Sequence, residues 1–170
     1  MPDDASAPVI TAAHVEKETL VVDVNIPAHD ARVTTPLFSH TRELALQACG
    51  GRCYVCGRTA EESGHPIELH HYPVERSLGD LVDWVLFQAQ AQAGDYGPGP
   101  QTFDWSSFDP VKWFTFVDDM RHNGLALCKQ HHTVADTGIH TLPHPLWLAQ
   151  RFAKEGYQFD KVEIIHHEQV

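Results

Sequence analysis

Two short pieces of the sequence decide the fold: CYVCG at residues 53–57 and CKQHH at residues 128–132. In each piece, two metal-binding side chains have two residues between them, so that a tight turn can aim both ligand atoms at one ion. Two such pairs complete a tetrahedral site, and thiolate sulfur favours zinc over hard cations such as Mg²⁺. The sequence therefore predicts a structural zinc ion held by Cys53, Cys56, Cys128 and His131.

The long separation of the two pairs leaves alternatives open. Seventy-one residues separate Cys56 from Cys128, whereas simple zinc ribbons leave about 15–20, so an insertion between the pairs is expected. The cysteines could instead be ordinary buried apolar side chains. Cys49 is expected to be a core residue at a helix end, with replacement of one of the four ligands as its alternative role.

Two adjacent histidines, His70 and His71, belong to a strand predicted over residues 67–72. Neighbouring side chains of a strand point to opposite sides unless the end of the strand is twisted. One imidazole can then bind a metal ion while the other acts as a base. A neutral imidazole, with a pKa of ~6.5, is suited to accepting a proton from water near neutral pH.

Further candidates surround the second metal-binding pair. His132 follows that pair directly, and Asp136 lies four residues later, on the same face of a helix predicted over residues 129–136. His132 and Asp136 are therefore expected to share an ion. Asn123 precedes the second pair by five residues, where its amide can hold a loop in place.

The other histidines are weaker candidates. His122 and His140 flank the second pair, and each could contact phosphate or complete a ligand set, or else have a supporting or surface role. Six others are expected to be exposed and without a role in metal binding: His14, His29, His40, His65, His166 and His167.

Together, CYVCG at 53–57, LHH at 69–71 and NGLALCKQHH at 123–132 resemble the HNH family of nucleases, the His-Me finger or ββα-metal group. The resemblance is to the subgroup whose motif is braced by a zinc knuckle. It covers roughly residues 42–72 and 121–140, about 50 of the 170 residues. GIHTLP at residues 138–143 also resembles an extension of some phage-encoded members, and this resemblance implies a phage-encoded protein.

The resemblance implies a role for each motif residue. His71 matches the general base that activates water, and His70 occupies a position that holds an Asp or His metal ligand. His132 matches the final motif histidine, a ligand to the catalytic ion, and Asp136 stands where some members have a further His ligand. Asn123 matches the central asparagine, which orients the loop that positions the base.

The implied activity is metal-dependent hydrolysis of phosphodiester bonds of DNA, leaving 5′-phosphate and 3′-hydroxyl ends. A site of His70, His132 and Asp136 is compatible with Mg²⁺, Mn²⁺, Ni²⁺ or Zn²⁺ as the catalytic ion. Two features depart from the family pattern. The gap between His71 and Asn123 is long, and the ligand set mixes imidazoles with a carboxylate.

The expected fold class is α+β, a ββα-metal core braced by the Cys₃His zinc site. Residues 1–40 form an N-terminal extension with one or two strands, and residues 41–170 form the HNH-like domain, with a helical acidic insertion at about 77–120. Strands are predicted at 18–26, 31–38, 67–72, 125–128 and 161–165. Helices are predicted at 42–48 (capped by Thr41), 79–92, 105–120 (helical after Asp109-Pro110), 129–136 and 145–155.

The net charge of −11 counts against a nuclease, because phosphate binding calls for clustered basic residues. Residues 80–120 contain seven acidic residues and one basic residue, whereas the motif stretches are nearly neutral. The basic residues close to the motifs, which suffice for a local patch, are Arg52, Arg58, Arg76, Arg121 and Lys129.

The acidic insertion suggests a second reading of the chain. It could restrict access to a cleft, dock a basic partner, or be a solvated face with an aromatic packing side. The alternative function is accordingly a catalytically weak or inactive zinc-braced binding module that docks a protein partner through the insertion. The sequence has no apolar run of the roughly 20 residues that a spanning helix needs, and its start lacks the pattern of a signal peptide. The expected location is the cytoplasm, that of the host if phage-encoded, with DNA as a partner and no membrane.

Overall fold

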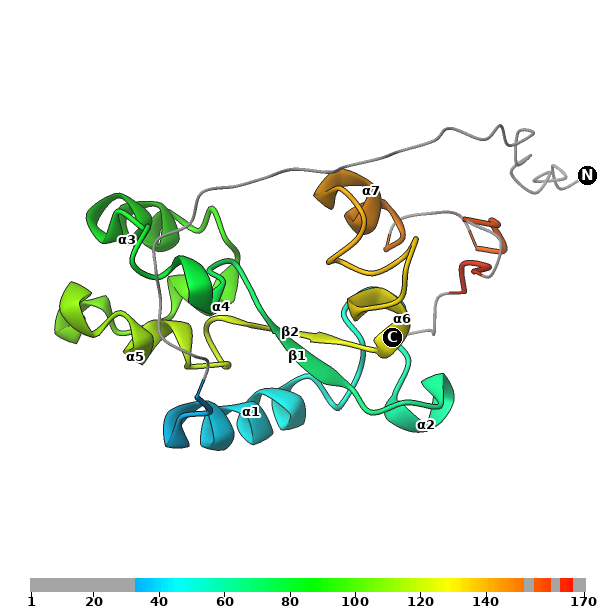
Figure 1. The fold of residues 1–170 in the computed structure, drawn as a ribbon, viewed down its shortest axis with the longest axis horizontal. Helices are drawn as coiled ribbons and strands as arrows, with labels where there is room; N and C mark the ends of the chain where they lie inside the picture. Colours follow the sequence, from blue (N-terminus) through cyan, green and yellow to red (C-terminus); the bar gives the residue numbers. More distant parts are fainter. Residues whose placement is uncertain (1–32, 152–154, 160–162, 167–170) are drawn as a thin grey trace, which may run out of the picture.

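The computed structural model in Figure 1 describes residues 33–151, 155–159 and 163–166. Its centre is a two-stranded sheet of β1 (Glu68–His71) and β2 (Gly124–Leu127). We call this pair of strands the hairpin, although the whole insertion lies between them in the chain. The strands are antiparallel, with Glu68 opposite Leu127 and His71 opposite Gly124. Both strands were predicted, and the pairing joins segments on either side of the insertion. Gly124 is required there because a side chain at this position would collide with the carbonyl of Met120.

The hairpin is followed by α6 (Lys129–His132), so β1, β2 and α6 follow in the order strand, strand, helix. The helix predicted over residues 129–136 is wrong beyond His132, where α6 ends. The last helix, α7 (His144–Ala149), is likewise shorter than the predicted 145–155. The short α2 (Ala60–Ser63) follows the first cysteine pair and has a complete capping box between Thr59 and Glu62.

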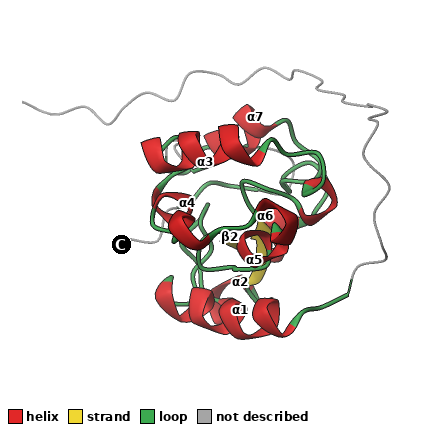
Figure 2. Ribbon diagram, turned by 90° about the vertical axis from the view of Figure 1, so that its left-hand side faces the viewer, coloured by secondary structure: helices red, strands yellow, loops and turns green. Residues whose placement is uncertain are grey.

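Helix α1 (Pro36–Ala48) covers one face of the hairpin, opposite α7, as Figure 2 shows. The Thr35 side chain accepts a hydrogen bond from the amide of Phe38, and Pro36 fits the first turn. The predicted start at Thr41 is therefore wrong, and so is the extended structure predicted for residues 36–38. Thr41 lies inside the helix, where its hydroxyl accepts a hydrogen bond from the amide of Met120.

The residues from 76 to 120 form a separate lobe, seen at the left of Figure 1. It contains α3 (Trp84–Ala93), α4 (Pro98–Gln101) and α5 (Phe114–Val117). Helix α3 begins at Trp84 and not at residue 79 as predicted. The lobe also has three 3₁₀ turns, Arg76–Leu78, Trp105–Ser107 and Pro110–Lys112, and the last of them lies where an α-helix was predicted to begin. Asp109 caps the last of these turns by accepting from the amide of Val111.

Two apolar cores hold the described residues together. The first lies between the hairpin, the cysteine pairs and α7, and consists of Cys53, Val55, Ile67, Ala126, Leu127, Cys128 and Trp147. The second lies inside the insertion and consists of Val74, Trp84, Phe87, Ala91, Trp105, Phe116 and Val117. The aromatic residues of the insertion are thus mainly packing residues, which was one of the readings left open by the sequence.

The predicted strand at residues 18–26 and the start of the one at 31–38 lie outside the described residues. Of the strand predicted at 161–165, Ile164 forms an isolated antiparallel bridge with Gln158. Among the described residues, no helix has the length and apolar character needed to cross a bilayer.

Candidate metal centres

The four predicted zinc ligands come together in a cluster that could hold a metal ion, formed by Cys53, Cys56, Cys128 and His131. The Sγ atom of Cys128 lies 3.2 Å from Nδ1 of His131. The Sγ atom of Cys53 lies 3.7 Å from the same nitrogen, and the Cys56 and Cys128 sulfurs are 4.0 Å apart. A tetrahedral zinc ion with standard bond lengths needs separations of about 3.6–3.8 Å. The observed values lie on both sides of this range, so shifts of a few tenths of an ångström would let the four ligand atoms bind one ion.

Local backbone structure aims the two pairs at each other. The first pair sits on a turn closed by a hydrogen bond from the amide of Gly57 to the carbonyl of Cys53. Gly57 has a φ of 73°, a conformation that glycine adopts at little cost. The amide of Tyr54 donates to the carbonyl of Ala126 on β2, which fixes this turn to the hairpin. Cys128 is the N-cap residue of α6, so the second pair spans the start of that helix.

The crowding of the thiols pulls the pKa values of Cys53 and Cys56 apart. Hydrogen bonds from Cys128 and then Cys56 lower the pKa of Cys53, while Cys128 and Cys53 raise that of Cys56. Burial disfavours a charged His131, but hydrogen bonds to Cys128, Cys53 and Glu163 outweigh it and raise its pKa to about 11. A cation bound among these groups would offset the repulsion between the thiolates.

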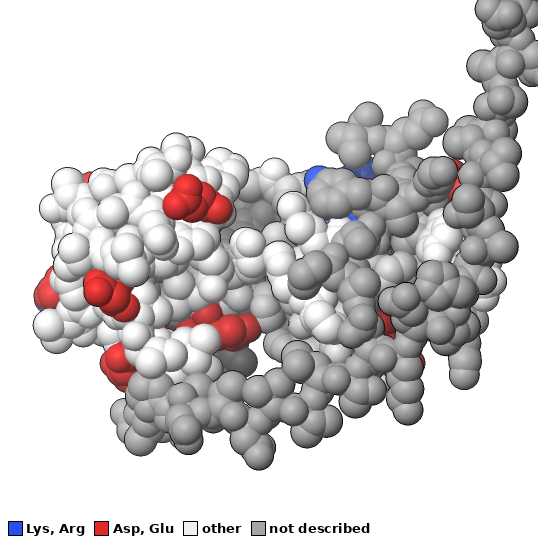
Figure 3. Space-filling model, turned by 90° about the horizontal axis from the view of Figure 1, so that it is seen from above, with Lys and Arg blue, Asp and Glu red and all other residues white. Residues whose placement is uncertain are grey.

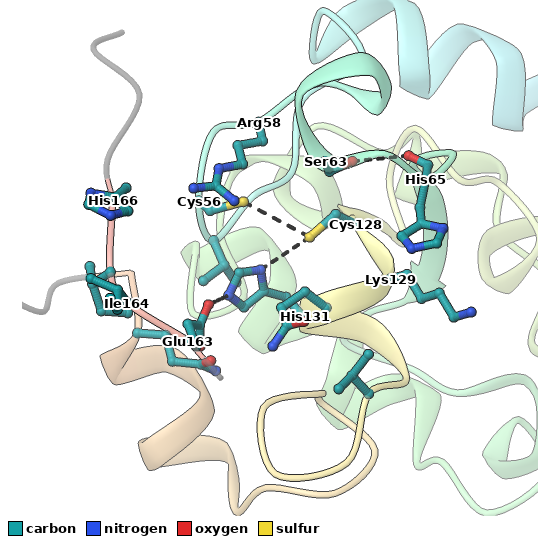
Figure 4. Close-up of a pocket in the computed structure, with 15 residues that line it drawn as sticks. Cys56, Arg58, Ser63, His65, Cys128, Lys129, His131, Glu163, Ile164 and His166 are labelled. Carbon is teal, nitrogen blue, oxygen red and sulfur yellow. Dashed lines mark hydrogen bonds and ion pairs between the residues drawn. The ribbon is translucent and has the colours of Figure 1, made fainter. Parts of the chain in front are cut away.

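Glu163 contacts the imidazole of this cluster. Its Oε1 atom lies 2.6 Å from Nε2 of His131, on the side of the ring that faces away from the sulfurs, as Figure 4 shows. A carboxylate in this position fixes the orientation of a metal-binding imidazole. Glu163 was not predicted from the sequence, since it lies 32 residues after His131 and belongs to no motif.

A second cluster lies between β1 and α6. One ligand atom from each of His70, His132 and His140 lies within 4.8 Å of the others. The Nε2 atoms of His132 and His140 are 3.2 Å apart, within the range of about 2.9–3.4 Å expected for two imidazoles on one ion. The rings of His70 and His140 have centroids 4.8 Å apart. Three imidazoles therefore converge on one point.

Carboxylates also orient this second cluster. Nδ1 of His132 lies 2.5 Å from Oε2 of Glu68, which leaves its Nε2 facing His140. Nε2 of His70 lies 3.1 Å from Oε1 of Glu75. Together with Glu163, these residues give three imidazole–carboxylate pairs in the two clusters. Neither Glu68 nor Glu75 was identified from the sequence.

The structure does not bring Asp136 into this group. The expectation that Asp136 lies one helical turn from His132 is wrong because α6 ends at His132 and Asp136 is exposed, with a φ of 73°. His140 stands in the cluster instead. The sequence left His140 open as a ligand, a supporting residue or a surface residue.

His71 points to the opposite face of the hairpin, as strand alternation predicts. Its ring stacks on Phe38 of α1, with centroids 5.6 Å apart. Its Nε2 atom lies 3.9 Å from Oδ1 of Asp118, and only 3% of the residue is exposed. In this structure the implied general base therefore does not reach the site formed by His70 and His132.

Asn123 holds a loop, as the sequence suggested. Its Oδ1 atom accepts a hydrogen bond from the amide of Val74, and its Nδ2 atom donates to the carbonyls of Val74 and Val117. Asn123 is fully buried. It therefore joins the segment that follows β1, which carries Glu75, to the end of the insertion.

The other candidates lie elsewhere. Cys49 ends α1 but is exposed, so the expectation of a core residue is wrong. It also stands outside the Cys₃His group.

The remaining histidine candidates that the structure describes also lie outside the two clusters. Nδ1 of His122 lies 2.9 Å from the carbonyl oxygen of Gly99. His40 and His65 are exposed, and His166 lies 2.6 Å from Glu155. His14, His29 and His167 lie outside the described residues.

Comparison of the chain with models of known families, with curated proteins and with solved structures gave no match.

Proposed function

We propose that the protein is a metal-dependent HNH-type endonuclease that hydrolyses phosphodiester bonds of DNA. In this proposal, a structural zinc ion is bound by Cys53, Cys56, Cys128 and His131. A divalent catalytic ion, Mg²⁺, Mn²⁺, Ni²⁺ or Zn²⁺, is bound by His70, His132 and His140. The observation that carries the proposal is the convergence of these three imidazoles beside the Cys₃His cluster.

The arrangement of the chain supports this assignment. The second cysteine–histidine pair spans the start of α6, so a zinc ion there would fix the helix that carries His132. The pairing of β1 with β2 places His70 against that helix, where its ring lies 5.4 Å from that of His132. In this proposal the Cys₃His cluster has a structural role and holds α6 in place. The histidine cluster is the more open of the two, since His140 is exposed.

The chemistry of the three-histidine cluster fits hydrolysis. A divalent ion bound there would lower the pKa of a water ligand and stabilise the negative charge that develops on the phosphorus oxygens. Glu68 and Glu75 keep the rings of His132 and His70 in orientation. Three protein ligands leave coordination positions for phosphate and water.

His71 as the general base stays a prediction from the resemblance. To act on a water at the histidine cluster, its imidazole would have to leave its contact with Phe38 and turn to the other face of the hairpin. Asn123 anchors the segment next to it, in agreement with the loop-orienting role that the resemblance implies.

Plasmid cleavage with each of the four ions tests the proposal. His70→Ala and His132→Ala should each lower the rate of cleavage by about 100-fold or more, because each removes a ligand of the ion that stabilises the negative charge of the transition state. His122→Ala, outside the cluster, is the matched control and should cleave like the wild type. Loss of cleavage in a folded His71→Ala protein that still binds the ions would support the general-base role of His71.

The alternative function, a zinc-braced module with little or no cleavage activity, is favoured by one observation. His71 is buried and faces away from the histidine cluster. This alternative predicts that the wild type and the His132→Ala protein leave the plasmid equally intact with every ion.

A further inference from the structure

The insertion exposes an unusual number of apolar side chains. Of the eight large hydrophobic residues that are exposed among the described residues, five lie between residues 81 and 114. We call these five the insertion surface: Leu81 (58% exposed), Val85 (78%), Leu86 (56%), Val111 (85%) and Phe114 (43%).

Two contacts place the parts of the insertion surface next to each other. The indole Nε1 of Trp113 donates a hydrogen bond to Oδ1 of Asp80, at 2.8 Å. The ring of Trp113 also packs so closely on Gly79 that a β-carbon there would collide with it. Because Trp113 lies between Val111 and Phe114 in the chain, that segment runs beside the residues that lead into α3.

Helix α3 has an apolar face that nothing in the described chain covers. The spacing of Leu81, Val82, Val85, Leu86 and Ala89 predicted an amphipathic helix over residues 79–92 with these residues on its apolar face. Val82 does pack against the core of the insertion, but the other four are exposed. The helix instead buries Trp84, Phe87 and Ala91 in the core of the insertion. Its first turns are therefore apolar on both sides, which is typical of a helix covered on both sides. A patch of this kind on a folded protein marks an interaction site.

The charge of the insertion indicates what kind of partner fits. Five exposed aspartates lie here: Asp80, Asp83, Asp95, Asp104 and Asp109. The exposed basic residue in the same region is Lys112. Figure 3 shows several of the acidic side chains on this half of the molecule. Such a surface repels nucleic acid, and it also disfavours a second copy of a chain whose net charge is −11.

We propose that the insertion surface docks a partner protein through a cationic amphipathic helix. The apolar side of that helix would cover Leu81, Val85 and Leu86, and its basic residues would face the surrounding aspartates. This interaction is independent of the nuclease activity proposed above, because the surface shares no residue with either metal cluster.

A labelled 18-residue peptide of leucine and lysine, patterned as an amphipathic helix, serves as the probe. Its binding to the full-length protein is followed by fluorescence anisotropy at low and high salt. The double variant Val85→Ser/Leu86→Ser should bind at least tenfold more weakly than the wild type. The matched control is Val33→Ser, which removes a valine that is 67% exposed but lies outside the insertion, and it should bind like the wild type.

The double variant Asp80→Asn/Asp95→Asn tests the charge contribution. Asparagine at position 80 keeps an acceptor for Trp113, and neither aspartate caps a helix, so the fold should be kept. Binding of the peptide should weaken severalfold at low salt, and the difference from the wild type should shrink at high salt because exposed charges are screened. A peptide with glutamate in place of lysine should not bind.

Two results would overturn the proposal. The first is that Val85→Ser/Leu86→Ser binds the peptide as tightly as Val33→Ser does, with circular dichroism showing both proteins folded. The second is that light scattering shows the wild type to be a dimer and Val85→Ser/Leu86→Ser a monomer, which would make the occupant a second copy of the chain.

Discussion

His70 and His71 are neighbours in the chain but lie on opposite faces of the hairpin. His70 lies against His132 and His140 on the side of α6, whereas His71 is buried against Phe38 of α1. The alternation of side chains along β1 produces this separation. The imidazole of His70 is therefore part of the candidate catalytic cluster, whereas that of His71 packs against α1.

The first prediction concerns the packing role of His71. His71→Ala should lower the free energy of unfolding by about 2–3 kcal/mol, because it removes a buried ring and leaves a cavity. The control His40→Ala changes an exposed histidine of α1 and should have no measurable effect. Denaturant unfolding of both variants measures the difference. Equal stability of the His71→Ala protein and the wild type would mean that the ring does not occupy this packed position.

The second prediction concerns the zinc cluster. The purified protein should contain about one tightly bound zinc ion per chain, and Cys53→Ser or Cys128→Ser should abolish it, because each removes a thiolate from a closed tetrahedral site. Cys49→Ser is the matched control, since Cys49 is exposed and outside the cluster. Elemental analysis gives the zinc content. If the metal-free chain has the same melting temperature as the purified protein, the cluster does not hold a structural zinc ion.

The third prediction concerns pH. The hydrogen bonds that outweigh burial raise the pKa of His131 to about 11 in the metal-free fold, above its ordinary value of 6.5. Protonated His131 therefore stabilises that fold fully below pH 6.5, and this contribution is lost as the pH rises through about 11. Zinc binding requires the unprotonated ring, so zinc affinity should rise with pH.

Competition with a chromophoric chelator between pH 6 and 9 measures this dependence. The apparent zinc affinity should increase by about tenfold per pH unit for each proton released. Glu163→Gln should make the zinc affinity less dependent on pH, because Glu163 contributes to the raised pKa of His131. An affinity that is the same at all pH values would contradict the protonated state assigned to His131.

Much of the fold follows from local patterns in the sequence. The Cys-x2-Cys and Cys-x2-His spacings identified the four residues of the first cluster, and the apolar runs around His70 and Leu125 identified both strands. Helix limits were predicted less well. Helix α1 begins earlier than expected, because the Thr35 side chain caps it and Pro36 fits its first turn.

The residues that were missed depend on tertiary structure. Glu68, Glu75 and Glu163 acquire a role only because folding places each beside an imidazole. Asp136 was chosen on the assumption that α6 continues, and the end of α6 at His132 places His140 in the cluster instead. The buried face of α3 was assigned to aliphatic residues because the packing of Trp84 and Phe87 in the insertion core has no local signature.

Plasmid cleavage by His140→Ala and Asp136→Ala proteins, side by side with the same divalent ion, tests the central claim most directly. Because His140 lies in the three-histidine cluster and exposed Asp136 does not, His140→Ala should lose cleavage by about 100-fold while Asp136→Ala keeps the wild-type rate. The reverse pattern, with cleavage kept in His140→Ala and lost in Asp136→Ala, would contradict the site described by the structure.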